Sequence, residues 1–455
     1  MKRISTGNPQ LDLILCGGLP HNSINVVMGA PGSGKTIFAE QLVFANAGPD
    51  CRVLYITTLS EPLPKMVTYL QTYAFVDIAR IGSDVVYHSL SEELMADAQQ
   101  LHDEVLALIK QHRPRIIVID SFKAIADLLP NTQAWRKMVF DLAGLLTAYG
   151  ATSLWIGEYT WETGSGPIEF AIADGIIELQ RVQRGARDER YIRVAKLRGS
   201  GFRDGSHAFW IADDGLHVFP RLVTPSVSPE YEPVLERVQT GIVGLDAMIE
   251  NGWLRGTSTL LQGPSGSGKT MVALHFLRQA VEEGEPALLV NFQENPEQLR
   301  RSMNSLGWNT DELLGPTKLD HFYISPVELQ IDTIVQEIFR RLTERRVQRL
   351  VIDAVGDLRK SAYDPTRFDD YLYSMLQHFA ISNVTVMLTV ETPRSSPEQP
   401  PLEGGVSYMS DNIVALTVEL GTELYRWVRI LKTRGSAHDG RKRVLHIGPR
   451  GIIVE

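Results

Sequence analysis

Gly29-Ala-Pro-Gly-Ser-Gly-Lys35-Thr36 occurs early in the sequence, and Gly263-Pro-Ser-Gly-Ser-Gly-Lys269-Thr270 repeats its pattern in the second half. Both stretches match G-x-x-x-x-G-K-[ST], the P-loop pattern. Each follows an apolar run, residues 24–28 or 258–261, and precedes a helical stretch, which is the context that the motif requires. The sequence therefore predicts two phosphate-binding loops.

The residue types of these loops explain their chemistry. Glycines let backbone N–H groups close around phosphate oxygens, and the start of the following helix adds a favourable dipole. The lysine reaches the outer phosphates and the threonine hydroxyl holds magnesium. We expect ATP and Mg²⁺ as ligands, with ATP bound by Gly29, Gly32, Ser33, Gly34, Lys35, Thr36, Gly263, Gly266, Ser267, Gly268, Lys269 and Thr270.

Acidic residues end other apolar runs in both halves. Asp120 and Asp353 are placed where a carboxylate would complete a magnesium site through an ordered water. Glu158 and Glu391 end further runs, at positions suited to sensing a γ-phosphate. The predicted metal-site residues are Thr36, Asp120, Thr270 and Asp353.

The same signals recur along the whole chain at a nearly constant offset. Lys35 and Lys269 lie 234 residues apart, and Asp120 and Asp353 lie 233 apart. A repeat of this length indicates duplication of one domain. In each half, short β-branched runs alternate with helical stretches, which predicts an α/β fold with a mainly parallel sheet flanked by helices.

A proline-rich stretch separates the halves. Pro220, Pro225, Pro229 and Pro233 remove backbone donors and stiffen the chain there. We predict an N-terminal domain of residues 1–225, a linker of residues 226–235 and a C-terminal domain of residues 236–455.

Composition bounds the class of protein. The chain has 455 residues, of which 44% are hydrophobic and 22% charged, as in ordinary globular proteins. No apolar run is long enough to span a membrane, so we expect no membrane partner and a cytoplasmic location. The net charge of −9 offers no general attraction to nucleic acid, which is not expected as a partner. Two cysteines, Cys16 and Cys51, are read as free thiols.

The order of these motifs resembles the KaiC family over almost the whole chain. The matching residues in the first half are Thr6-Gly7, Leu11-Asp12, Gly17-Gly18 and Lys196-Leu-Arg198-Gly199. Those in the second half are Thr240-Gly241, Leu245-Asp246, Gly252 and Lys432-Thr-Arg434-Gly435. The resemblance implies two RecA-like P-loop domains.

The resemblance also implies a homo-hexameric ring with ATP between subunits. Each protomer would contribute Lys196 and Arg198, or Lys432 and Arg434, to the nucleotide of its neighbour. A head-to-tail interface that closes on itself makes such a ring. An arginine supplied from the next subunit would stabilise charge on the γ-phosphate and make turnover depend on assembly.

The sequence departs from this family at the catalytic base. Where the family has two consecutive glutamates after a strand, this chain has Ser60-Glu61 and Gln293-Glu294. Serine and glutamine orient a water but do not take up its proton near neutral pH, so we expect slow hydrolysis. The predicted catalytic residues are Glu61, Glu294, Lys35, Lys269, Arg198 and Arg434.

The resemblance to the clock proteins of the family raises the question of autophosphorylation. Ser407-Tyr408 lies where these proteins have neighbouring phosphate-accepting residues, so Ser407 is the candidate phosphosite. Tyr408 replaces the second acceptor and Gln293 replaces the base that would activate the hydroxyl. An ordinary loop serine is the favoured interpretation, and autokinase activity is at most weak.

Three functions compete at this point. The leading one is a slow, magnesium-dependent ATPase whose rings signal nucleotide state to regulatory protein partners that the sequence does not name. The second is a nucleotide-switched scaffold with negligible hydrolysis, favoured by Ser60 and Gln293. The third is a RecA-like motor acting on DNA, which the net charge and the absence of an added DNA-binding domain disfavour.

Overall fold

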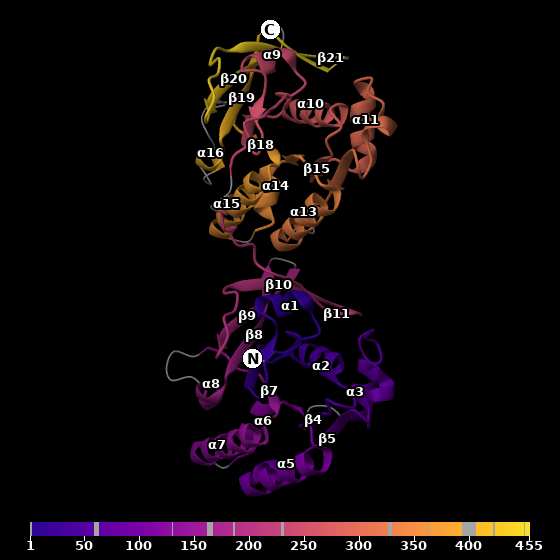
Figure 1. Cartoon of the computed structure of the whole chain (residues 1–455), viewed down its shortest axis with the longest axis vertical. Coiled ribbons are helices and arrows are strands. Elements are labelled where there is room, and N and C mark those ends of the chain that lie inside the picture. The colour runs from indigo at the N-terminus through magenta and orange to yellow at the C-terminus, as the bar shows by residue number, and fades with distance from the viewer. Residues whose placement is uncertain are drawn as a thin grey trace. The chain divides into compact units, whose positions relative to one another are not determined.

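The computed structural model (Figure 1) describes residues 2–58, 63–129, 131–161, 167–184, 187–228, 232–325, 330–362, 364–393, 406–421, 424–449 and 451–455. The chain divides into two compact units, residues 1–221 and 222–455. Both are α/β units with a mainly parallel sheet between helices, as the sequence predicts.

The first unit contains β1 (Arg3–Ile4), α1 (Pro9–Ile14), β2 (Leu19–Pro20), β3 (Ile24–Met28), α2 (Lys35–Asn46), β4 (Val53–Thr57), α3 (Leu63–Leu70), η1 (Ile78–Arg80), β5 (Val85–Ser89), α4 (Glu92–Ala96), α5 (Ala98–His112), β6 (Ile116–Asp120), α6 (Phe122–Leu128), α7 (Thr132–Tyr149), β7 (Thr152–Gly157), α8 (Ile168–Ile172), β8 (Gly175–Arg184), β9 (Arg187–Leu197), β10 (Ser206–Ala212) and β11 (Gly215–Phe219).

The second unit contains β12 (Arg237–Val238), α9 (Val243–Ala247), β13 (Trp253–Leu254), β14 (Ser258–Gly263), α10 (Lys269–Glu282), β15 (Ala287–Asn291), α11 (Pro296–Ser305), α12 (Thr310–Leu313), β16 (Leu319–Tyr323), α13 (Ile331–Arg345), β17 (Arg349–Asp353), α14 (Val355–Lys360), α15 (Pro365–Ile381), β18 (Thr385–Glu391), α16 (Val406–Met409), β19 (Asn412–Leu420), β20 (Leu424–Thr433), β21 (Arg443–Gly448) and β22 (Gly451–Val454).

One sheet topology is used twice. Within the described residues, the first unit has a nine-stranded sheet in the order β11-β10-β9-β8-β3-β7-β6-β4-β5. The second unit has the sheet β16-β15-β17-β18-β14-β19-β20-β21-β22, which is the same order read from the other end. In the first unit, the strands from β3 to β8 pair with one another in parallel, and β8 to β11 pair antiparallel. In the second unit, the strands from β14 to β19 pair with one another in parallel, and β19 to β22 pair antiparallel.

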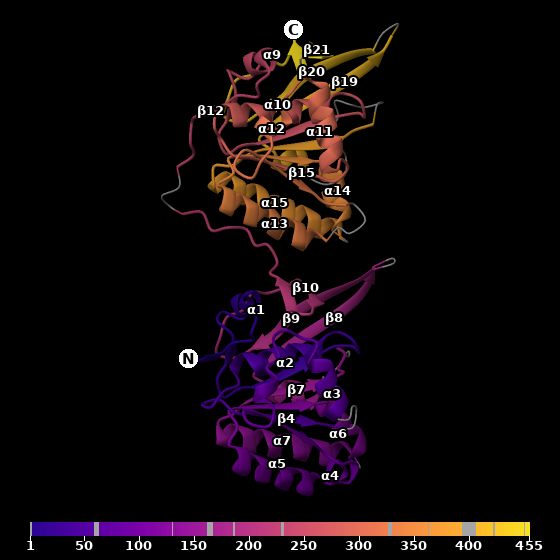
Figure 2. The same cartoon turned by 90° about the vertical axis from the view of Figure 1, so that its right-hand side faces the viewer.

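Helices cover both faces of each sheet (Figure 2). In the first unit, Val26 packs with α5 and α7 on one face, and Val27 packs with α2 on the other. Neighbouring residues of a strand point to opposite faces, so a strand covered on both sides is buried throughout and mostly apolar. This explains why all five residues of β3 are buried.

The Thr-Gly and Leu-Asp motifs close a turn in each unit. Asp12 Oδ1 accepts hydrogen bonds from the backbone N–H and the hydroxyl of Thr6, each at 2.8 Å. Asp246 Oδ1 accepts from the backbone N–H of Thr240, also at 2.8 Å. In the first unit, Gln41 of α2 donates to the carbonyl of Gly7, which ties the turn to the helix that follows the P-loop.

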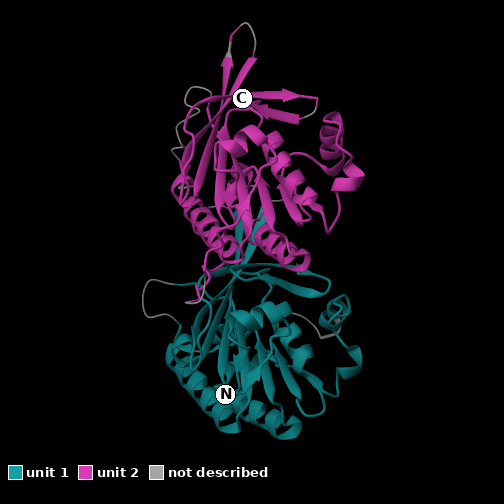
Figure 3. Cartoon of the chain, turned by 45° about the horizontal axis from the view of Figure 1, so that its top comes forward, with its two compact units in different colours: residues 1–221 teal, residues 222–455 magenta. Residues whose placement is uncertain are grey.

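The chain passes between the units just after Arg221 (Figure 3). Two residues at the start of the second unit bind α15: Thr224 Oγ1 lies 3.0 Å from Ser374 Oγ, and His378 Nε2 lies 3.0 Å from the carbonyl of Val223. Residues 229–231 of the predicted linker lie outside the described residues.

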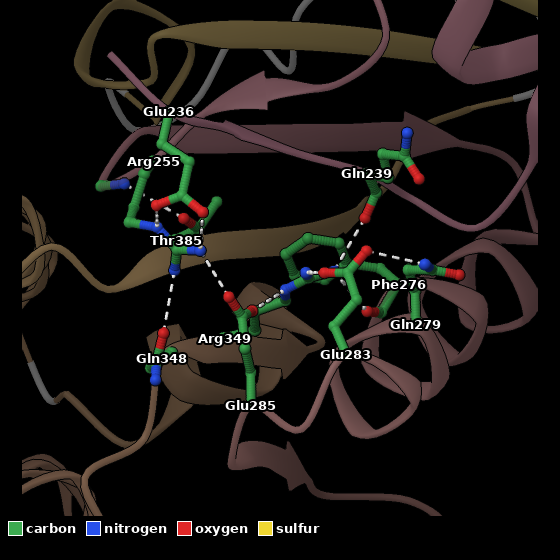
Figure 4. A network of polar contacts seen from close by, with 11 residues as sticks. Glu236, Gln239, Arg255, Phe276, Gln279, Glu283, Glu285, Gln348, Arg349 and Thr385 are labelled. Atoms are coloured by element: carbon green, nitrogen blue, oxygen red, sulfur yellow. Dashed lines mark hydrogen bonds and ion pairs between the residues drawn. The ribbon is translucent and has the colours of Figure 1, made fainter. Parts of the chain in front are cut away.

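A buried ionic network belongs to the second unit (Figure 4). Arg349, at the start of β17, is fully buried and donates to Glu285 at 2.6 Å, to Glu283 and to the carbonyl of Gln239. Arg255 binds Glu285 and Glu236. The network joins the segment around β12, through Glu236 and Gln239, to the amino ends of the sheet strands β15 and β17.

No helix in the described part of the chain is long and apolar enough to cross a membrane.

Candidate nucleotide-binding sites

Each P-loop connects a central strand to the helix that packs behind it. The helices α2 and α10 begin at Lys35 and Lys269, after glycines whose φ angles are 103° and 100°. Residues with a Cβ rarely adopt this left-handed conformation, which explains the glycine before each lysine. Lys35 Nζ donates to the carbonyl of Gly29 at 2.9 Å, and Lys269 Nζ donates to that of Gly263 at 2.8 Å.

The predicted metal-site residues meet in both units. Thr36 Oγ1 donates to Asp120 Oδ2 at 2.9 Å, and Thr270 Oγ1 donates to Asp353 Oδ2 at 2.8 Å. Each pair joins residues more than 80 positions apart in sequence, because the carboxyl ends of parallel strands lie at one edge of the sheet. A hydroxyl and a carboxylate are oxygen ligands of the kind that Mg²⁺ prefers.

A cavity of about 340 Å³ adjoins the first P-loop. It is lined by Pro31, Gly32, Lys35, Thr36, Tyr55, Thr57, Thr58, Met66, Asp120, Ser121 and Glu158. Burial lowers the pKa of Lys35, and the negative charges of Glu158 and Asp120 oppose this change. Glu158 therefore lies in the same cavity as the P-loop lysine.

A buried group of polar side chains behind Asp120 was missed by sequence reasoning. Tyr55 donates to Asp120 Oδ2 at 3.1 Å, and Tyr87 donates to Glu40 Oε2 at 2.8 Å. Burial raises the pKa of Glu40 to about 8, and the charge of Asp120 adds to the increase while the Tyr87 hydrogen bond opposes it. The sequence offered one signal for this group: Glu40 is a charged residue among the apolar residues of the helix that follows the P-loop.

The second site supports its carboxylate differently. Thr389 of β18 donates to Asp353 Oδ1 at 2.5 Å. Leu289 and Leu274 occupy the positions that correspond to Tyr55 and Glu40. The two P-loops are therefore alike, but the side chains behind their aspartates differ.

The two candidate residues after β15, Gln293 and Glu294, have different hydrogen-bond partners. Gln293 lines a cavity of about 300 Å³ together with Glu391, and its amide donates to Asp357 at 2.9 Å. Glu294 lies at 3.4 Å from Ser302 of α11, and burial raises its pKa, with the charge of Asp353 adding to the increase. The corresponding Ser60 and Glu61 lie outside the described residues.

Two arginines beside the P-loops were also missed. Arg426 of β20 donates to the carbonyl of Gly266 at 2.9 Å. In the first unit, a Cβ placed on Gly32 would lie 3.2 Å from Arg181 Nη1, so this guanidinium borders the loop. The signal in sequence was weak, because each arginine lies in a strand that carries at least one other basic residue.

The Lys-x-Arg residues do not reach the P-loop of their own unit. Arg198 lies 3.8 Å from Asp174, which accepts a hydrogen bond from Ile24, the first residue of β3. Arg434 lies 3.6 Å from Asp411, which accepts from Ser258, the first residue of β14. The first P-loop begins directly after the last residue of β3, and the second begins at Gly263, the last residue of β14. In each unit, the arginine therefore lies near the amino end of the central strand, and the P-loop lies at its carboxyl end.

The lysines of these motifs lie beside them. Lys196 Nζ donates to the carbonyl of Phe170 at 2.9 Å, and Lys432 Nζ donates to those of Ser410 and Ser407 at 2.6 and 3.2 Å. Ser407 belongs to the short helix α16 and is partly exposed.

The P-loops have the polar groups that a bound nucleotide needs. Ser33 Oγ and Ser267 Oγ are buried, and neither has a hydrogen-bond partner among the described residues. Buried hydroxyls of this kind are costly unless a ligand or water completes them. Together with the lysine, the threonine and the glycine-rich backbone, they fit the phosphates of ATP with Mg²⁺.

Comparisons with known proteins agree with this arrangement. The model of the KaiC ATPase family matches residues 4–223 and again residues 238–455. The chain belongs to the KaiC family. The RecA-like double domain and the family that the motifs indicate are thereby confirmed.

Individual KaiC proteins are similar over nearly their whole length. The circadian clock oscillator protein KaiC of Rippkaea orientalis is 26% identical, over 100% of this chain and 89% of its own. The protein of the same name from Synechococcus elongatus is 25% identical, over 98% and 87%. The circadian clock protein KaiC3 of Synechocystis is 26% identical, over 100% and 92%. Both halves of this chain thus carry a KaiC-type ATPase domain.

Proposed function

We propose that this chain is a slow, Mg²⁺-dependent ATPase that assembles as a homo-hexameric ring with ATP bound between subunits. The position of Arg198 and Arg434 carries the proposal. In each unit a strand of five or six residues separates the arginine from the P-loop. Such a strand spans roughly 15 to 20 Å, which is longer than an arginine side chain.

This separation favours a contribution to the neighbouring subunit. A subunit with the P-loop on one side and the arginine on the other presents two different surfaces. In a head-to-tail arrangement, the arginine side of one subunit meets the P-loop side of the next. Lys196 and Arg198 of one protomer would then meet the ATP on the first P-loop of the next. Lys432 and Arg434 would do the same in the second ring.

Each side chain has a defined task in hydrolysis. Lys35 and Lys269 turn from the loop carbonyls to the outer phosphates, and the P-loop N–H groups hold these phosphates in place. Thr36 with Asp120, and Thr270 with Asp353, hold the metal. Mg²⁺, when bound, offsets the negative charge that develops during phosphoryl transfer. The neighbour's arginine adds to this stabilisation, so turnover depends on assembly.

Slow turnover is expected because neither half has the usual first glutamate. Gln293 has no proton-accepting group near neutral pH. Nucleotide state, read by protein partners through the shape of the ring, is the proposed output. Autophosphorylation of Ser407 is expected to be weak at most, since its activating base is missing.

The nucleotide-switched scaffold remains the second candidate, favoured by the same observation of Gln293. ADP release by the purified chain with ATP and Mg²⁺ separates the two functions. Turnover that falls in Lys35→Ala or Lys269→Ala supports the ATPase and identifies the working ring. ATP binding and ATP-dependent assembly without ADP release would favour the scaffold. Salt-sensitive binding of single-stranded DNA would instead favour the motor.

A further inference from the structure

The amide of Gln293 is held by a carboxylate that the second half alone provides. Gln293 Nε2 donates to Asp357 Oδ2 at 2.9 Å. Asp357 lies in the first turn of α14 and is 5% exposed. The corresponding residue of the first half is Ala124. The contact therefore belongs to the second site only.

The chemistry of the two groups fixes the direction of the amide. A carboxylate only accepts hydrogen bonds, so the amide nitrogen of Gln293, rather than its oxygen, must face Asp357. The other carboxylate oxygen, Oδ1, accepts from Lys360 at 2.8 Å. Gln293 Oε1 is consequently the end of the amide that is turned away from Asp357, and it acts as an acceptor.

Glu391 links the surroundings of Gln293 to the second P-loop. Gln293, Asp357 and Glu391 line the same cavity of about 300 Å³. Glu391 is paired in register with Gly263, the first residue of the P-loop, and its charge acts on Lys269. The P-loop residues are not among those that line this cavity. Asn291, which ends β15 two residues before Gln293, pairs in register with Asp353 of the predicted metal site. Gln293 therefore lies at the carboxyl ends of the strands, on the same side of the sheet as the P-loop.

We propose that Gln293 orients the attacking water in the second site and that Asp357 is the positioning residue that holds its amide. The inference rests on the proposed ATPase function. The water oxygen forms a bond to the γ-phosphorus, and the bond from that phosphorus to the bridging oxygen of ADP breaks. The proton of the water leaves on the phosphate product, because glutamine does not accept it. Water-positioning glutamines serve GTP-hydrolysing P-loop proteins in this way.

The test measures steady-state ATP hydrolysis by the full chain with Lys35→Ala, so that turnover reports the second site. Asp357→Ala should lower kcat by roughly tenfold or more, because a misplaced water reacts slowly, while KM changes little. Asp357→Asn keeps an amide oxygen that can accept from Gln293, and it should retain more of the rate. Asp364→Asn, at the N-cap of α15, is the matched control and should leave kcat unchanged.

A double-mutant cycle distinguishes positioning from a general structural effect. In a Gln293→Ala background, Asp357→Ala should cause no further loss of kcat, because its effect passes through Gln293. The profile of kcat between pH 6 and 8 should be flat for Gln293, whereas Gln293→Glu should introduce a fall at the acid side.

Three outcomes would overturn the inference. Unchanged kcat in Asp357→Ala, or losses that add in the double variant, would remove the positioning role while the ATPase function stands. Retained turnover in Gln293→Ala with loss in Glu294→Gln would assign the water to Glu294. ATP binding without any turnover in the Lys35→Ala parent would refute hydrolysis at the second site, and the inference with it.

Discussion

The hydroxyl of Tyr55 lies 3.1 Å from Oδ2 of Asp120 and donates a hydrogen bond to it. Tyr55 is fully buried, and the same carboxylate oxygen accepts from Thr36. In the second half, Leu289 occupies the place of Tyr55 and Thr389 binds the aspartate instead. The two sites therefore hold equivalent carboxylates through different partners.

Tyr55→Phe removes only this hydroxyl and should weaken magnesium binding at the first site. A hydrogen bond to a charged group contributes about 1.5 to 3 kcal/mol, so the Mg²⁺ concentration for half-maximal turnover should rise roughly tenfold. The measurement uses a Lys269→Ala background, in which the first site alone reports. Tyr87→Phe, whose hydroxyl binds Glu40 instead, is the control; equal effects of both changes would contradict a specific role for Tyr55.

Glu40 should make the stability of the chain depend on pH. Its folded-state pKa of about 8 lies above the value near 4.3 expected in an unfolded chain. Between these values the folded form keeps a proton that the unfolded form has lost. The free energy of unfolding therefore falls as pH rises through this window. Below the window Glu40 costs no stability, and above it the loss is complete and no longer changes with pH.

Glu40→Gln removes this titration and keeps an acceptor for Tyr87. The variant should be little different from the parent near pH 4.5 and more stable by a few kcal/mol at pH 8. Thermal unfolding of both proteins across this range measures the difference. A stability difference that stays constant with pH would show that Glu40 does not titrate in this range.

Mixing two inactive variants tests the contribution of Arg198 to a neighbour. In a Lys269→Ala background, neither Lys35→Ala nor Arg198→Ala should turn over ATP at an appreciable rate. Mixed rings place the intact arginine of one variant against the intact P-loop of the other, and random mixing should restore roughly a quarter of the turnover. Activity equal to the mean of the two separate variants would place the arginine's role within its own subunit.

The buried network of Arg349 should contribute to the stability of the second unit. Arg349→Leu leaves the carboxylates of Glu283 and Glu285 without their buried partner, and such a loss costs about 3 to 5 kcal/mol. Urea unfolding followed by a probe in the second unit measures the change. Arg340→Leu, which breaks exposed ion pairs on α13, should have a small effect, and comparable losses would argue against a special role for burial.

Several features could be predicted from the sequence because they depend on neighbouring residues. The P-loops, the buried strands before them and the duplication follow from local composition and spacing. The central strands lie where the apolar runs predict them: for example, residues 116–119 lie within β6, and residues 385–388 within β18. Asp120 and Asp353 were also found, because each directly ends such a run.

Other features of the sites depend on contacts between distant segments. Nothing near Gln293 in sequence indicates Asp357, since the two residues meet only where β15 and α14 approach one another. Tyr55 and Glu40 look like ordinary core positions until the sheet brings them behind Asp120.

Sequence by itself thus determined the family, the fold and the phosphate-binding loops, because glycine conformations and strand patterns are local properties. Tertiary structure decided which side chains support each carboxylate. It also placed Arg198 and Arg434 near the amino ends of the central strands, whereas the P-loops lie at the carboxyl ends. The physical reason is that parallel strands align their carboxyl ends at one edge and their amino ends at the other. Residues far apart in the chain therefore share a site, whereas the P-loop and the Lys-x-Arg arginine of one unit are separated by the length of a strand.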